Sequence, residues 1–154
     1  MWRCDGIAPL ASRLSPHSSP QGYIFGGNTA EGGASQKIAM TSPVRTEAVG
    51  GGVHRVSFVL PSKYNLKTLP VPADARVQLR EVGAHVAAAL EFSGGVDDTD
   101  AFSKKTAELR ALLSNHGLVA SGEPPVLADY YPPFAPGWLR KREVIIPLKD
   151  EGKA

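Results

Sequence analysis

Apolar and polar residues alternate with a period of two along several short stretches of the chain. In the clearest of them, Val56 and Phe58 fall on one face and Arg55 and Ser57 on the other. This period is that of a half-buried β-strand, whose successive side chains point to opposite faces of a sheet. Extended segments are predicted over residues 37–44, 53–60, 77–80, 86–92, 126–131 and 142–148.

A different period occurs between residues 101 and 116, where apolar residues recur at helical spacing and charged residues occupy the other side. The inner face is expected to hold Phe102, Leu109, Leu112 and Leu113. Gly117 follows at the place of a left-handed C-terminal cap. We therefore predict one amphipathic helix packed against a sheet. Because strands outnumber helices, the pattern indicates the α+β class.

Residues 1–21 carry neither of these periods. Pro9, Pro16 and Pro20 interrupt the segment, and proline removes a backbone donor from a helix or a sheet. We therefore expect an irregular N-terminal segment over residues 1–21 and one folded domain over residues 22–150.

The composition fits a single globular domain and demands no nucleic-acid or membrane-surface partner. Of 154 residues, 42% are hydrophobic, and 17 basic against 15 acidic side chains leave a net charge of +2. Scattered charges of this balance demand no nucleic acid, and no apolar run reaches the roughly 18 residues of a transmembrane helix. The single cysteine, Cys4, cannot form an internal disulfide, so a reducing compartment is the default. We expect the cytoplasm or a plastid, because residues 1–20 are weakly similar to a plastid or mitochondrial transit segment.

Several short strings, in the order of the chain, carry more information than their patterns. They combine aromatic, glycine and proline residues, and no single one of them is specific. The strings are YIFGGN at 23–28, KIAMTSPV at 37–44, FVLP at 58–61, FSG at 92–94, YYPPF at 130–134 and WLRKREV at 138–144. Together they resemble the SOUL heme-binding protein family, over residues 22–148 of this chain.

This resemblance implies a distorted antiparallel β-barrel with one or two packed helices, built from two strand-helix-strand-strand repeats. It also implies the binding of heme or a related tetrapyrrole without catalysis. Family members carry a first strand and a helix before the YIFGGN string, whereas Ser15–Gln21 holds two prolines that oppose a helix. We therefore expect the first repeat to be incomplete, which leaves open a barrel without its first strand, an alternative start or an error in the gene model. An exposed strand edge of this kind favours self-association.

Four basic side chains are candidates for anchoring a tetrapyrrole. The resemblance implies an apolar pocket with basic side chains at its edge, which suits a macrocycle whose propionates need cationic partners. The matching residues are Lys37 and the run Arg140, Lys141 and Arg142 before the last strand. The alternative is that these are solvated surface charges. Because neighbours along a strand alternate in direction, the three residues of the run are not expected to act alike.

Four further side chains are candidates for contact with the macrocycle or its iron. Met40 could touch the porphyrin or donate a thioether, or it could fill a gap in the core. Phe134 and Trp138, in a proline-rich loop, could stack on the ring or plug the mouth of a barrel. His54 shares the parity of an apolar strand face and is the best candidate axial ligand, although a strand-end histidine with a backbone partner is the simpler interpretation. The four histidines show no metal-ligand spacing, so no metal site is predicted.

No catalytic residues are predicted. The lone cysteine lies in the N-terminal segment, no Gly-x-Ser-x-Gly string occurs, and the glycine-rich loop lacks the Lys-Ser/Thr ending of a P-loop. The sequence therefore predicts non-enzymatic binding of heme or another tetrapyrrole, for transport, buffering or signalling. The alternative is a protein-interaction or effector-sensing module on the same fold that binds no porphyrin.

Overall fold

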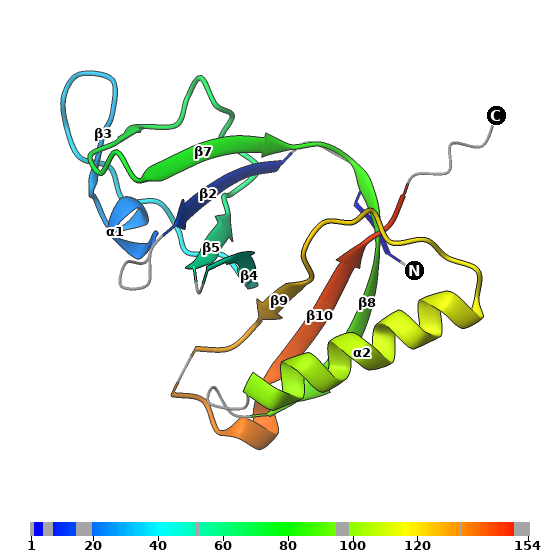
Figure 1. Ribbon diagram of the computed structural model, residues 1–154. Helices are drawn as coiled ribbons and strands as arrows, with labels where there is room; N and C mark the ends of the chain where they lie inside the picture. Colours follow the sequence, from blue (N-terminus) through cyan, green and yellow to red (C-terminus); the bar gives the residue numbers. More distant parts are fainter. Residues whose placement is uncertain are drawn as a thin grey trace. The chain divides into compact units, whose positions relative to one another are not determined.

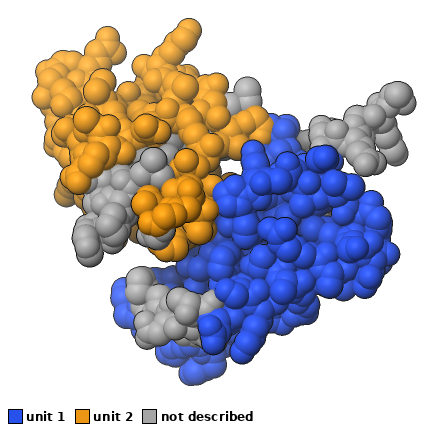
Figure 2. All heavy atoms as spheres, viewed as in Figure 1, with its two compact units in different colours: residues 1–5, 84–154 blue, residues 6–83 orange. Residues whose placement is uncertain are grey.

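The computed structural model describes residues 2–4, 8–14, 20–51, 53–94, 99–132 and 134–149. Two compact units make up the chain (Figure 2). Unit 1 comprises residues 1–5 and 84–154, and unit 2 comprises residues 6–83. Among the described residues, no helix has both the length and the apolar character needed to cross a membrane.

Unit 2 is built on four antiparallel strands in the order β4-β5-β2-β7 (Figure 1). Their bounds are Ala8–Leu14 for β2, Val44–Gly50 for β4, Val53–Val59 for β5 and Val77–Val82 for β7. A short helix, α1 (Gln21–Ile24), follows β2, and the strands β3 (Asn28–Thr29) and β6 (Val71–Pro72) form a separate pair. Gly50, at the end of β4, and Gly51, in the turn to β5, have φ angles of 97° and 60°, in the left-handed region that favours glycine.

Unit 1 contains four antiparallel strands in the order β9-β10-β8-β1. Their bounds are Trp2–Cys4 for β1, His85–Ser93 for β8, Val126–Asp129 for β9 and Lys141–Pro147 for β10. The helix α2 (Thr99–Asn115) packs against β8 and β10, and a 3-10 turn, η1 (Gly137–Leu139), precedes β10 (Figure 1). Gly117 has a φ of 67° and ends the helix in the predicted left-handed conformation.

The two units repeat one topology. In chain order, β2, α1, β4 and β5 of unit 2 correspond to β8, α2, β9 and β10 of unit 1, and β7 and β1 are the additional outer strands. The α+β class is confirmed, with antiparallel pairing and two α-helices among the described residues. The described strands do not close into a barrel. The prediction of an incomplete first repeat is wrong, because its first strand and its helix are both present.

The N-terminal segment, predicted to be irregular, supplies both β1 and β2. β2 pairs with β5 from Leu10 to Leu14 and with β7 from Ala8 to Arg13, so it is an inner strand of unit 2. Pro9 precedes the pairing with β5, where its missing N–H removes no bond to that strand. The prediction of an irregular segment is therefore wrong for these strands. The argument for self-association through a missing first strand loses its basis with it.

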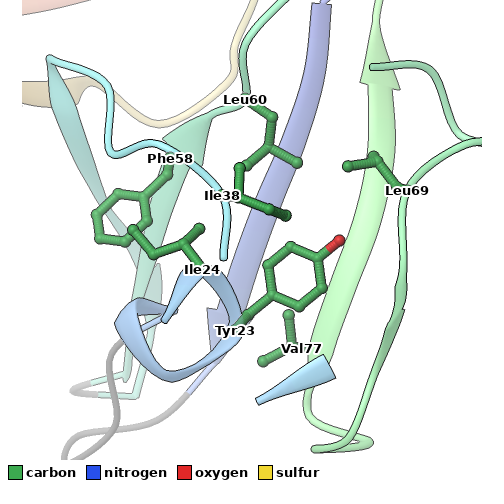
Figure 3. Packing of buried hydrophobic residues seen from close by; sticks show 7 residues of the cluster. All are labelled: Tyr23, Ile24, Ile38, Phe58, Leu60, Leu69 and Val77. Atoms are coloured by element: carbon green, nitrogen blue, oxygen red, sulfur yellow. The ribbon is translucent and has the colours of Figure 1, made fainter. Parts of the chain in front are cut away.

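A hydrophobic cluster holds α1 against one face of the unit 2 sheet. Its members are Tyr23, Ile24, Ile38, Phe58, Leu60, Leu69 and Val77. Tyr23 and Ile24, from α1, point toward the side chains of the neighbouring strands (Figure 3). Phe58 and Leu60 are buried on the face that the alternation predicted to be apolar.

A second cluster joins α2 to the sheet of unit 1. Its buried members are Phe92, Leu109, Leu113, Val144, Ile146 and Leu148. The inward positions predicted for the last strand, among them Val144 and Ile146, are confirmed. On α2, Leu109 and Leu113 are buried as predicted, whereas Leu112 is 41% exposed and was wrongly placed on the inner face. One residue turns the helix by about 100°, so the neighbour of Leu113 points away from the sheet.

The YIFGGN string is explained by backbone contacts at its end. Nδ2 of buried Asn28 donates to the carbonyl oxygens of Tyr23 at 2.6 Å and Gln36 at 2.7 Å, and its Oδ1 accepts from the N–H of Gln36 at 2.9 Å. An asparagine can donate twice and accept with one small side chain. A Cβ on Gly27 would lie 2.7 Å from the carbonyl oxygen of Gly22, so only glycine fits there without a shift. These residues therefore report on the fold rather than on a ligand.

The Tyr23 hydroxyl makes the stability of unit 2 depend on alkaline pH. Burial, with the nearby Tyr64, raises the pKa of Tyr23 from 10.0 to about 12. The folded state then binds the proton more tightly than the unfolded state, so this contribution is full below pH 10 and is lost as pH rises toward 12. We expect the unfolding free energy to fall over that interval, measured by urea unfolding followed by circular dichroism.

Two tyrosine variants separate this effect from general alkaline unfolding. Tyr23→Phe should remove that part of the pH dependence and cost about 1 kcal/mol at neutral pH, through loss of the hydrogen bond from its hydroxyl to the carbonyl oxygen of Pro70. Tyr131→Phe changes an exposed tyrosine and should leave the dependence intact. An unchanged pH profile in Tyr23→Phe would contradict the prediction.

Candidate ligand-binding site

Arg140 is the most unusual of the predicted anchors. It follows η1 with an extended backbone and has the strand parity of Arg142 and Val144, on the side of the unit 1 sheet that faces α2. The residue is only 2% exposed, and its Nε and Nη1 atoms are buried without a hydrogen-bond partner. Unpartnered donors of a buried cation are costly, because water is lost and no acceptor replaces it. Arg140 can therefore receive an anionic group.

Arg142 is equally buried, but its charge is already engaged. Its Nε donates to Oδ1 of Asp129 at 2.8 Å, and its guanidinium lies 5.4 Å from the centre of the Phe92 ring. Asp129, Arg142 and Phe92 are register partners on β9, β10 and β8, so they share one face. Sequence analysis missed Asp129, and only strand pairing could have found it. This arrangement favours a structural role for Arg142.

Lys141 points to the opposite face of β10. Its Nζ lies 3.0 Å from a Glu91 oxygen and 3.2 Å from a Glu143 oxygen, and 5.0 Å from the centre of the Tyr130 ring. Hydrogen bonds to Glu91 and then to Glu143 raise the pKa of Lys141 above its ordinary value. The three residues of the basic run are thus placed differently, and Arg140 alone has unpartnered buried nitrogen atoms.

The loop before Arg140 presents aromatic side chains to solvent. Phe134 is 88% exposed and Trp138 is 77% exposed. Two turns shape the loop, with the N–H of Ala135 donating to the carbonyl of Pro132 at 3.0 Å and the N–H of Leu139 to that of Pro136 at 2.9 Å. At these exposures neither aromatic ring fills a cavity, so they are not plugs.

The remaining candidates lie in unit 2 and are not gathered into a site. Lys37 and Met40 are exposed and precede β4, in a segment without the predicted strand. His54 lies beside the turn at the start of β5, opposite Ala48, and is also exposed. Its parity matches that of the apolar face, but the hydrophobic cluster reaches only as far as Val56. In the described parts of the chain, no group of three or more metal-ligating side chains occurs.

Solved structures show the same fold at low identity. The C-terminal domain of EcmrR has a TM-score of 0.67 and 9% identity, with 96% of this chain and 94% of that chain covered. A hydrolase from Listeria innocua has a TM-score of 0.61 and 12% identity, with 96% and 90% covered. At such identities these structures are evidence for the fold alone.

The sequence itself carries a family signature. The model of the SOUL heme-binding protein family matches residues 17–147. The chain therefore belongs to this family, as its aromatic, glycine and proline strings predicted. No curated protein matches the sequence.

Proposed function

We propose that this protein binds heme or a related tetrapyrrole without catalysing a reaction on it. The observation that carries the proposal is the buried guanidinium of Arg140, with Nε and Nη1 unpartnered in a member of a heme-binding family. A propionate of the macrocycle would supply the acceptors that these atoms lack. A charge-assisted hydrogen bond of this kind is worth about 1.5–3 kcal/mol.

The aromatic loop before Arg140 offers the macrocycle an apolar surface. Phe134 and Trp138 lie in a loop held by turns, so few rotatable bonds would lose their freedom when these rings stack on a macrocycle. The two candidate iron ligands, His54 and Met40, are exposed rather than held in an apolar pocket. Binding should therefore be hydrophobic and ionic, with little contribution from the iron.

Titration with hemin, followed by its Soret band, tests the proposal. We expect saturation at one equivalent, a dissociation constant of micromolar order or weaker, and a similar affinity for metal-free protoporphyrin. Arg140→Gln should weaken hemin binding about tenfold or more, while Arg110→Gln, an exposed charge on α2, should leave it unchanged.

Thermal melting of the same variants separates ligand binding from a structural role. The free Arg140→Gln protein should melt no lower than the parent, because an unpartnered buried charge does not stabilise the fold. A clear drop in its melting temperature would instead assign Arg140 to the structure. Equal hemin affinities of parent and Arg140→Gln would place the propionates elsewhere.

The exposed aromatic loop also favours a second candidate, a protein-interaction or effector-sensing module. Aromatic side chains that face solvent are common anchors of protein interfaces. If hemin and protoporphyrin both fail to bind, this second function becomes the better one. A partner should then lose affinity when Phe134 and Trp138 are changed to serine.

A further inference from the structure

The unit 2 sheet has a polar face on the side away from its hydrophobic cluster. Phe58 and Val77 point into that cluster (Figure 3), so their neighbours along β5 and β7 point to the other face. On β4 the same parity turns Val44 toward the cluster and its neighbour away. The polar residues placed on the second face are Arg45 and Glu47 on β4, Arg55 and Ser57 on β5, and Gln78 and Arg80 on β7.

Two adjacent donors on this polar face are buried without partners. Arg45 and Ser57 are register partners on β4 and β5, so their Cβ atoms are about 5 Å apart. Neither Nε of Arg45 nor Oγ of Ser57 has a hydrogen-bond partner, and Ser57 is 2% exposed. A guanidinium N–H and a hydroxyl can both donate to one acceptor group. Their positions therefore point to an anion.

The charges around these donors are strongly unbalanced. Oε1 of Glu47 lies 3.3 Å from Nη1 of Arg55 and 3.8 Å from Nη2 of Arg80, so one carboxylate serves two guanidiniums. With Arg45, three positive charges and one negative charge leave +2 among the described side chains of the polar face. A dianion would neutralise this excess, whereas a single carboxylate would leave half of it.

The side chains of the polar face differ in their exposure to solvent. The side chain of Arg80 is 50% exposed and that of Arg55 is 30% exposed, while Ser57 is almost fully buried. Exposure thus decreases from β7 toward the unpartnered hydroxyl. An anion could approach along the partly exposed arginines and reach the buried Nε of Arg45 and Oγ of Ser57.

We propose that the polar face of unit 2 binds the dianionic phosphoryl group of a small molecule. Arg45 and Ser57 donate hydrogen bonds to its oxygens, and Arg55 and Arg80 compensate its charge. In the free protein, the carboxylate of Glu47 pairs with these two arginines. A phosphoryl group fits because it carries nearly two negative charges and three strong acceptors. The site involves none of the residues assigned to tetrapyrrole binding and does not rest on that function.

Calorimetric titration of the full chain with inorganic phosphate tests this proposal. We expect saturable binding at one site, with phenyl phosphate binding as well or better if the natural ligand is a phosphate ester. Acetate should bind at least tenfold more weakly, because it carries one charge. If neither phosphate binds saturably, the proposal is overturned, and Nε of Arg45 and Oγ of Ser57 are then taken to bind water instead of an anion.

Four variants test the site: two are expected to weaken phosphate binding, one to strengthen it, and one, the matched control, to leave it unchanged. Arg45→Gln should weaken phosphate binding at least tenfold, and Ser57→Ala severalfold. Glu47→Gln should strengthen it, because it removes the competing carboxylate. Arg76→Gln removes an exposed charge of unit 2 that is paired with Asp74 in the turn before β7, and it should change affinity less than twofold.

The same variants distinguish a specific site from a general charge effect or from misfolding. A loss in Arg76→Gln equal to that in Arg45→Gln would mean a general charge effect and would overturn the site. Weaker binding by Glu47→Gln would do the same. Circular dichroism of each variant checks folding, and if Arg45→Gln fails to fold, Ser57→Ala and Glu47→Gln still give opposite expectations. The hemin affinity of all four variants should equal that of the parent.

Discussion

Deletion of residues 1–14 is expected to prevent unit 2 from folding. This deletion removes β2, which pairs with β5 on one side and β7 on the other. The hydrogen bonds of two strand pairs are lost, and β7 is separated from β5. The loss exceeds what a domain stabilised by about 5–15 kcal/mol can tolerate. Circular dichroism and the dispersion of amide resonances from residues 20–83 measure the outcome.

A shorter deletion provides the control. Removal of residues 1–5 takes away β1, whose described pairs run from Trp2 to Cys4 at the outer side of β8. This variant should keep a folded unit 2 and a cooperative melt. If the longer deletion melted like the shorter one, β2 would not be needed in the sheet, and the correspondence between the two units would have to be abandoned.

Asn28→Asp should destabilise unit 2 by about 3–5 kcal/mol. The substitution keeps the shape but replaces the Nδ2 donor by an oxygen, which then faces the carbonyl oxygens of Tyr23 and Gln36 at the former distances of 2.6 and 2.7 Å. A buried and a part-buried carbonyl acceptor lose their donor, at about 1–3 kcal/mol each, and a charge is buried beside them. Urea unfolding at neutral pH gives the difference.

Asn65→Asp is the matched control for this substitution. Oδ1 of Asn65 accepts from the N–H groups of Lys67 at 2.9 Å and Thr68 at 3.1 Å, in an exposed turn. These hydrogen bonds use the acceptor oxygen that aspartate keeps, so the change should lie within about 0.5 kcal/mol. Similar losses at both positions would show that the donor of Asn28 is not what stabilises the loop.

The local patterns of this sequence determined much of its secondary structure. Alternation predicted the stretches that became β5, β7, β8, β9 and β10, and the helical period with Gly117 predicted α2. These patterns succeed because each element buries one face, and burial imposes its period on the nearest residues. Family membership was likewise readable, since residues such as Gly27 and Asn28 are required by backbone contacts within the loop.

The predictions that failed concern segments without such a period. Residues 8–14 have no alternation and contain Pro9, and they form a strand because β5 and β7 supply partners on both sides. The short α1 is similarly held by its hydrophobic cluster rather than by helix propensity. The pairing partners of such segments lie far away in sequence, so no local pattern reports them.

The sites divide in the same way between sequence and tertiary structure. Sequence alone selected the basic run before the last strand, but only the fold shows that Arg142 meets Asp129, that Lys141 meets two glutamates, and that Arg140 is buried with unpartnered nitrogens. The pairing of Arg45 with Ser57 was equally invisible, because their residue types are ordinary and only strand register makes them neighbours. Residue types along the chain determine which charges are present, whereas burial and register decide which of them remain available to a ligand.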